Sequence, residues 1–270
     1  MINIITRFSR EEGFKKCLES LNSQTHKEVH HYITYETQER LEYLKSFEYK
    51  YPTTFIRVPK YHKVKDLYLY YEHHDKDTDY LNWDWDKWDV KVVLGKEVPP
   101  RKQIECKKER FEKDGFWCES LSHSLRKWAV HFPWDIYNKI AEQHINEGWI
   151  VYLDDDDTYT SNESLEILAQ NIDQCSEDTL HLYRMKRETE DKKNVVPSSH
   201  FLKYHKAGHP LIFGEVGQGT FCFHSKYKEY TKWEGWSGDD YRTAKALEKV
   251  IPNKNFIEEV LYDALKPGLS

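Results

Sequence analysis

The chain has 270 residues, with 40 Lys and Arg, 46 Asp and Glu and a formal net charge of −6. Because charges of both signs are interspersed without a basic stripe, this acidic balance argues against a general nucleic-acid-binding protein, and we expect no nucleic-acid partner. No apolar run approaches a membrane span and the five cysteines form no Cys-x-x-Cys pair, which predicts reduced thiols, a cytoplasmic location and no integral membrane segment.

The first part of the chain alternates between apolar strand-like runs and amphipathic helical runs. Predicted strands cover 2–6, 29–35 and 53–58, and predicted helices cover 11–23 and 38–47. Ser9 is placed to cap the first of these helices. The resulting β-α-β-α-β order predicts a parallel sheet with right-handed crossovers, which is a nucleotide-binding type of half-domain.

Residues 60–128 break this alternation with many Tyr and Trp residues among charged ones. We interpret the segment as an insertion whose aromatic side chains mostly build a small core of their own. The alternating Trp83-Asp84-Trp85-Asp86 is typical of a strand or of a stacking platform. One or two of the aromatic residues could instead line a saccharide site, because aromatic side chains combine an apolar face with a polar handle.

The alternation resumes at Pro133, which is suited to begin a helix, and Gly148 is suited to end it. The later predicted elements are a strand over 149–153, a helix over 162–172, a strand over 179–183, a polar loop or hairpin over 188–199, a loop and buried strand over 217–224, a helix over 239–249 and a final strand or extended tail over 255–262. The aromatic loop 233–238 contains two glycines, and we expect it to close over a bound ligand.

These elements predict an α/β fold with a mixed, mostly parallel central sheet flanked by helices, and with a Trp/Tyr-rich insertion. No Gly/Ser-rich or Pro-rich linker divides the chain, so we predict a single domain over 1–270. Its nucleotide-binding half covers about 1–157, including the insertion at about 60–128, and its acceptor half covers about 158–270.

Four consecutive aspartates, Asp154 to Asp157, follow the apolar strand 149–153. Ligands bind outside the carboxyl ends of strands in open α/β sheets. Adjacent carboxylates repel one another, and a divalent cation such as Mn²⁺ or Mg²⁺ relieves this repulsion while bridging them to a substrate's phosphates. A solvated acidic turn explains one or two aspartates, whereas four favour a metal–phosphate site.

Three parts of the chain resemble glycosyltransferases of the GT-A (Rossmann-like) fold, closest to the inverting family 2 enzymes and to small stand-alone ones of bacteria and large DNA viruses. Segment 2–7 with its following helix and the Ser-Gln-Thr of 23–25 is similar to the family's nucleotide-binding start. Segments 133–138 and 148–157 are similar to the region with the D-x-D motif, and 238–241, Gly-Asp-Asp-Tyr, to an acidic pair that supplies the catalytic base. The insertion and 185–215 match nothing in the family.

The resemblance implies metal-dependent, inverting transfer of a sugar from a nucleotide-diphospho-sugar, preferably UDP-linked, to a hydroxyl of a glycan or glycoconjugate acceptor. It implies that Asp156 binds the metal together with Asp154. The residues expected to contact the nucleotide are Thr6, Arg7, Glu36, Asn138, Asp154 and Asp155. Asp240 is expected to be the general base, with Asp239 as the second choice because the family's pair is usually Glu-Asp. This chemistry suits the residues, since the transfer needs a cation for the leaving diphosphate and a carboxylate for the acceptor's proton.

Other interpretations stay open. The pair Asp239-Asp240 also suits an ordinary helix N-terminus, where acidic side chains are favoured. A sugar-nucleotide pyrophosphorylase uses a similar domain and Mg²⁺, but normally has a Gly-rich, basic loop after its first strand, and 6–13 contains one glycine. A non-catalytic carbohydrate-binding protein with structural Ca²⁺ would need spaced ligands, which four adjacent aspartates supply poorly.

Overall fold

The computed structural model describes residues 1–58, 67–73, 88–94, 116–121, 124–130, 135–189, 192–211, 215–233 and 239–264, of which 67–130, 188–194 and 200 are described as backbone only. The strands in this part of the chain are β1 Ile2–Arg7, β2 Val29–Tyr35, β3 Thr53–Arg57, β4 Leu67–His73, β5 Trp88–Leu94, β6 Phe116–Leu121, β7 Ser124–Val130, β8 Trp149–Tyr152, β9 Thr158–Tyr159, β10 Thr179–Thr189, β11 Lys192–Val196, β12 Phe221–His224 and β13 Asn253–Ala264. The helices are α1 Glu11–Asn22, α2 Gln38–Lys45, α4 Ile136–Glu142, α5 Ser164–Asp173, α6 Ser199–Lys206 and α7 Asp239–Val250, with 3-10 turns η7 Gln218–Thr220 and η8 Ser225–Tyr230.

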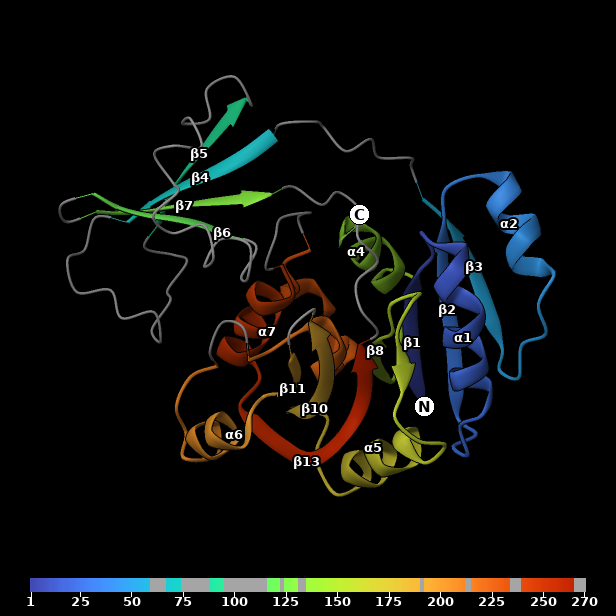
Figure 1. Cartoon of the computed structure of the whole chain (residues 1–270). Coiled ribbons are helices and arrows are strands. Elements are labelled where there is room, and N and C mark those ends of the chain that lie inside the picture. Colours follow the sequence, from blue (N-terminus) through green and yellow to red (C-terminus); the bar gives the residue numbers. More distant parts are fainter. Residues whose placement is uncertain are drawn as a thin grey trace.

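Most of the described strands form one nine-stranded sheet in the order β3-β2-β1-β8-β12-β10-β13-β9, with β11 paired to β10 (Figure 1). β3, β2, β1 and β8 are mutually parallel, and β10 and β13 are parallel to each other. β12 runs antiparallel between β8 and β10, so that β10 and β13 point in the same direction as β8. This confirms the predicted mixed, mostly parallel sheet flanked by helices.

Helices cover both faces of this sheet, which explains why its central strands are apolar at nearly every position. On β8, Trp149 and Val151 pack with buried residues of α1 and α5, whereas Ile150 and Tyr152 pack with those of α4 and α7. A separate group of buried side chains joins α1 and α2 to β2 on the same face as α5. The core is therefore double, with the sheet as its middle layer.

The insertion forms a second sheet, which is antiparallel and has the order β5-β4-β7-β6 among the described strands (Figure 1). It lies in the chain between β3 and α4, as the break in the α/β alternation predicted. The segment Trp83–Asp86 and the aromatic side chains of the insertion lie outside the described residues. The division into a nucleotide-binding half and an acceptor half stays a prediction.

The structure differs from the sequence prediction mainly in the second half. β10 extends to Thr189 and forms a hairpin with β11, which is one of the two forms expected for 188–199. Helix α6 was not predicted, because it is short. Its N-terminus is capped by the Ser198 hydroxyl, which accepts from the Phe201 backbone N–H at 3.4 Å. None of the described helices is long and apolar enough to cross a membrane.

Candidate functional site

The carboxyl ends of β1, β2 and β8 meet at one edge of the large sheet. Ile5 on β1 lies opposite Tyr152 on β8, so Arg7 at the end of β1 comes level with Asp154, two residues beyond β8. Glu36 follows the neighbouring β2 directly. The register of the three parallel strands therefore places Arg7, Glu36 and Asp154 at the same edge of the sheet.

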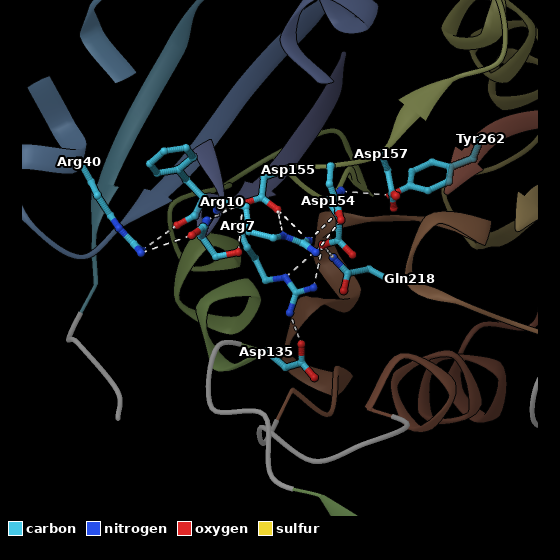
Figure 2. Close-up of polar contacts among 12 residues, drawn as sticks. Arg7, Arg10, Arg40, Asp135, Asp154, Asp155, Asp157, Gln218 and Tyr262 are labelled. Carbon is cyan, nitrogen blue, oxygen red and sulfur yellow. Dashed lines mark hydrogen bonds and ion pairs between the residues drawn. The ribbon is translucent and has the colours of Figure 1, made fainter. Parts of the chain in front are cut away.

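Asp154 and Arg7 form the centre of this edge (Figure 2). Oδ1 of Asp154 accepts hydrogen bonds from Arg7 Nε at 3.2 Å and Nη2 at 2.7 Å, and from Gln218 Nε2 at 3.0 Å. Arg7 also donates to Asp135, which precedes α4, so its guanidinium lies between two carboxylates. Burial alone would lower the pKa of Arg7, but Asp154 and Asp135 raise it, and the guanidinium stays charged.

Asp155 is buried beneath the start of α1. Its Oδ2 accepts from the backbone N–H groups of Ser9 at 2.5 Å and Arg10 at 2.6 Å, and from the Ser9 hydroxyl at 3.0 Å. The prediction that Ser9 caps α1 is therefore wrong, because the Ser9 hydroxyl donates to Asp155 and caps no N–H group. The carboxylate of Asp155 accepts from the N–H groups at the start of the helix instead. With both oxygens engaged and an exposed fraction of 1%, Asp155 has a structural role here, and this position does not favour the predicted contact with a nucleotide.

Asp156 is paired with Arg10. The guanidinium contacts both carboxylate oxygens at 2.5 Å and also reaches Oδ1 of Asp155 at 2.9 Å. Burial, together with the charges of Asp154 and Asp155 and against the effect of Arg10, raises the pKa of Asp156 to about 6. The charged form of Asp156 is thus unfavourable even beside Arg10, and a further positive charge would stabilise it.

Tyr262 of β13 holds the turn from the other side. Its hydroxyl donates to Asp157 at 2.7 Å and accepts from the backbone N–H of Asp154 at 3.0 Å. The ring packs on Gly219, where a Cβ would lie 2.4 Å from the Tyr262 Cζ, so only glycine fits there. Tyr262 therefore links the acidic turn to the loop that carries Gln218.

Gly13 of α1 makes an equally close contact with the acidic turn. A Cβ at this position would lie 2.5 Å from Cβ and 2.6 Å from Cα of Asp156, and 2.9 Å from the backbone oxygen of Asp155. We expect Gly13→Ala to lower the free energy of unfolding by about 1–3 kcal/mol, because overpacking must shift backbone, although alanine favours helices more than glycine. Urea unfolding measures this, with the exposed Lys16→Ala of the same helix as control. A Gly13→Ala protein as stable as the wild type would show that the turn is loosely held.

The two acidic segments predicted from the sequence lie near one another. Asp240, partly exposed at the start of α7, accepts from the Tyr241 backbone N–H at 2.7 Å. A Cβ at Gly217 would lie 3.7 Å from Oδ2 of Asp240, and the next residue, Gln218, contacts Asp154. Burial raises the pKa of Asp240, and the charge of Asp154 raises it further. A carboxylate with a raised pKa beside a polar edge suits a proton acceptor.

Asp239 and Asp135 are further carboxylates in this region. Asp239 is buried and accepts from Arg242 at 2.9 Å within α7. These contacts suit a residue that holds the start of the helix, so Asp239 stays the second choice for the base. Burial raises the pKa of Asp135 to about 7 although Arg7 lowers it, and Asp239, Asp154 and Asp240 each raise it through their charge. Asp135 was not among the predicted site residues, and its place in the Pro133–Asn138 segment of the resemblance was the available signal.

The remaining predicted nucleotide contacts have different environments. Thr6 is wholly buried with its hydroxyl 2.9 Å from His31 Nε2, so its side chain does not reach the edge where Arg7 lies. Glu36 accepts from the Tyr137 hydroxyl and from Arg40 at 3.2 Å, and lies at the edge as predicted. Asn138 is wholly buried on α4, and neither polar atom of its side chain has a partner in the described part of the chain. An unpaired buried amide is unfavourable, and its role stays a prediction.

The described residues supply too few ligands to fill the coordination shell of a divalent cation, so they fit one best together with phosphate oxygens. Across the described ranges, no three His, Cys, Asp or Glu side chains converge so as to hold a metal by themselves. Asp154 and Asp156 nevertheless offer carboxylate oxygens in the same turn, and burial makes the charge of Asp156 unfavourable there. One or two carboxylates completed by phosphate oxygens and waters is a common setting for Mg²⁺.

A buried carboxylate, Glu142, anchors the chain before the 234–238 loop, which itself lies outside the described residues. It accepts from the Tyr152 hydroxyl, from Trp233 Nε1 at 2.7 Å and from the Thr231 hydroxyl at 2.6 Å. Burial raises its pKa to about 7, although the bonds from Thr231 and Tyr152 and the charge of Lys139 lower it. Trp233, the last described residue before the loop, is thereby fixed to α4.

This raised pKa predicts a pH dependence of stability. Folded Glu142 keeps its proton up to about pH 7, whereas the unfolded chain releases it near the ordinary value of 4.5, so rising pH favours unfolding in this window. We expect Glu142 to lower the free energy of unfolding by up to about 3 kcal/mol between these pH values. Urea unfolding at pH 5 and pH 7.5 should show a smaller pH effect in Glu142→Gln than in the wild type. Equal pH effects in the two proteins would contradict this role.

No family model matches the chain, and no curated protein matches it. Solved structures of S. aureus TarS do. TarS 1-349 in complex with UDP-GlcNAc matches over 100% of this chain and 59% of that chain, with a TM-score of 0.54 and 12% identity. TarS 1-349 in complex with UDP matches over 98% and 60%, with a TM-score of 0.54 and 14% identity. The chain thus spans about three fifths of these TarS structures, and the likeness supports a glycosyltransferase fold without showing the narrower family 2-like assignment.

Proposed function

We propose that the chain is a glycosyltransferase that moves a sugar from a UDP-linked donor to a hydroxyl of a glycan or glycoconjugate, with inversion at the anomeric carbon. The observation that carries the proposal is the convergence of Asp154, bound to Arg7, and Asp240 around the Gly217–Gln218 loop at the carboxyl edge of the sheet. The shared fold supports it, since TarS has been solved in complex with UDP-GlcNAc and with UDP.

In this proposal the nucleotide lies along the ends of β1, β2 and β8. Glu36 contacts the base or ribose, and Asp154 is nearest the ribose. Asp156, with Asp154, holds Mn²⁺ or Mg²⁺, which when bound offsets the charge of the leaving diphosphate. Arg7 orients Asp154 through its two hydrogen bonds.

The acceptor hydroxyl approaches from the side of α7. Asp240 takes its proton, because it is the partly exposed member of the acidic pair and its raised pKa makes it a stronger base than an ordinary aspartate. A single displacement needs one such base and no enzyme nucleophile, and it inverts the anomeric configuration. We also propose a cytoplasmic location for the protein.

Titration of UDP and UDP-sugars by calorimetry, with and without Mn²⁺, tests the proposal. We expect UDP to bind in a Mn²⁺-dependent way and one UDP-sugar of a donor panel to be hydrolysed slowly when no acceptor is present. Formation of a sugar nucleotide from UTP and a sugar 1-phosphate would instead identify a pyrophosphorylase. Binding of free saccharides without any affinity for UDP would identify a carbohydrate-binding protein.

A further inference from the structure

We propose that Arg10 is an exchangeable cation of the donor site, which pairs with Asp156 in the metal-free protein and releases it when a divalent cation and a nucleoside diphosphate bind. This inference rests on the proposed function and deepens it. It follows from how the positive charges around the acidic turn are distributed in this chain.

The first step concerns access to Asp156. Arg10 contacts both of its carboxylate oxygens at 2.5 Å, in the two-pronged geometry that makes Arg–carboxylate pairs strong. A metal ion bound by Asp156 needs at least one of these oxygens. The guanidinium and the metal therefore compete for the same carboxylate.

The second step identifies Arg10 as the cation that can move. The side chain of Arg10 is 41% exposed, whereas that of Arg7 is 12% exposed and lies between Asp154 and Asp135. Arg10 also donates to Oδ1 of Asp155, from Nε at 3.1 Å and from Nη2 at 2.9 Å, but the backbone N–H groups at the start of α1 hold Oδ2 of Asp155 independently of the guanidinium. Release of Asp156 thus leaves the cap of α1 and the Arg7 contacts in place.

The third step is what the released side chain does. Arg10 directly precedes α1, and its guanidinium lies against the acidic turn, beside which the diphosphate is proposed to lie (Figure 2). Arginine binds phosphate oxygens in the same two-pronged way as carboxylates. Metal alone would have to break an ion pair, whereas metal with a diphosphate gives Arg10 a new partner. The two ligands then bind cooperatively, and each raises the affinity for the other by the same factor.

Mn²⁺ binding, measured by the electron paramagnetic resonance of the free ion, tests this without any turnover. In the absence of nucleotide, Arg10→Gln should bind Mn²⁺ at least about tenfold more tightly than the wild type, as expected for removal of a charged competitor. With saturating UDP this advantage should disappear, because the variant lacks the contact with the diphosphate. Lys15→Gln removes the same charge from an exposed position on the same helix and should leave Mn²⁺ affinity near that of the wild type.

Arg10→Lys provides a second variant if Arg10→Gln fails to fold, as judged by its thermal melt. Lysine keeps the charge but cannot contact both oxygens, so its Mn²⁺ affinity should lie above that of the wild type. The role of Arg10 is overturned if the folded variants bind Mn²⁺ no more tightly than the wild type. It is also overturned if Lys15→Gln raises the Mn²⁺ affinity by the same factor. A wild type that binds no UDP with or without Mn²⁺ overturns the proposed function instead, and the Mn²⁺ comparison without nucleotide still decides on Arg10.

Discussion

Asp240→Asn is expected to bind the UDP-linked donor as the wild type does and to transfer the sugar about 10²–10⁴-fold more slowly, which is the usual contribution of a general base. An asparagine keeps the size of the side chain and can still accept from the Tyr241 backbone N–H, so the start of α7 should survive. It cannot take a proton. Donor affinity by calorimetry and transfer by a radiolabelled-sugar assay separate these two effects.

The pH dependence of the same reaction provides a second measurement. The base works only when deprotonated, so the rate of transfer should rise with pH through the pKa of Asp240. Burial holds that pKa above its ordinary value of 3.8, and the midpoint of the rise should be raised in the same direction. The residual activity of Asp240→Asn should lack this rise.

Asp239→Asn is the matched control, because it makes the same chemical change one residue earlier. Asp239 is buried and paired with Arg242, so its loss should lower the free energy of unfolding by roughly 1–3 kcal/mol and slow transfer less than Asp240→Asn does. The reverse order of the two variants would make Asp239 the base. Normal transfer by both would leave the pair as an ordinary helix start.

The sequence predicted those features of the molecule that depend on local pattern. Apolar runs at 2–6, 29–35 and 149–153 are strands because both of their faces are covered, and they end where polar residues begin. In a parallel sheet these ends fall at one edge, which the strand pattern predicted, whereas the resemblance was needed to place Arg7 and Asp154 at the same site. The resemblance added Asp240, which no local pattern connects to Asp154.

The partners of the acidic turn could not be predicted, because tertiary packing chooses them. Tyr262 is 108 residues from Asp154, and Gln218 is 64 residues from it. Nothing in the spacing of either residue points to a carboxylate. Like-charge repulsion led to the prediction of a divalent cation among the aspartates, which stays a prediction, and it gave no sign that Arg7 and Arg10 also lie there.

The same limit applies to the predictions that Thr6 and Asp155 contact the nucleotide. Neighbouring residues of a strand point to opposite faces, so Thr6 faces His31 while Arg7 faces the site, and the resemblance did not separate the two. Asp155 differs from the neighbouring aspartates because the start of α1 lies against it. The sequence predicts at which residue α1 begins but not which residues its start contacts. The insertion strands and α6 lacked a strong period, and the prediction in these segments gave only a strand or stacking platform at 83–86, which lies outside the described residues.

Asp156→Asn is expected to fold as the wild type does and to lose the Mn²⁺-dependent part of its affinity for UDP. Asp156 is 15% exposed, and the amide oxygen of asparagine can still accept from Arg10, so we expect little change in stability. An uncharged amide is a much weaker ligand for a hard cation than a carboxylate. We expect UDP to bind at least about tenfold more weakly in the presence of Mn²⁺ and equally in its absence, since changes even around metal ligands lower metal affinity about 10–100-fold.

Asp157→Asn separates loss of a ligand from disturbance of the turn. Asp157 belongs to the same turn, but it is buried and accepts from the Tyr262 hydroxyl, a bond that an asparagine amide oxygen can also accept. Its Mn²⁺-dependent UDP affinity should therefore stay near that of the wild type. If Asp156→Asn binds UDP with Mn²⁺ as the wild type does, Asp156 is no metal ligand and its carboxylate serves to hold Arg10. If both variants lose affinity equally, the contribution of the turn lies in its shape, which Tyr262, Gly13 and the start of α1 maintain.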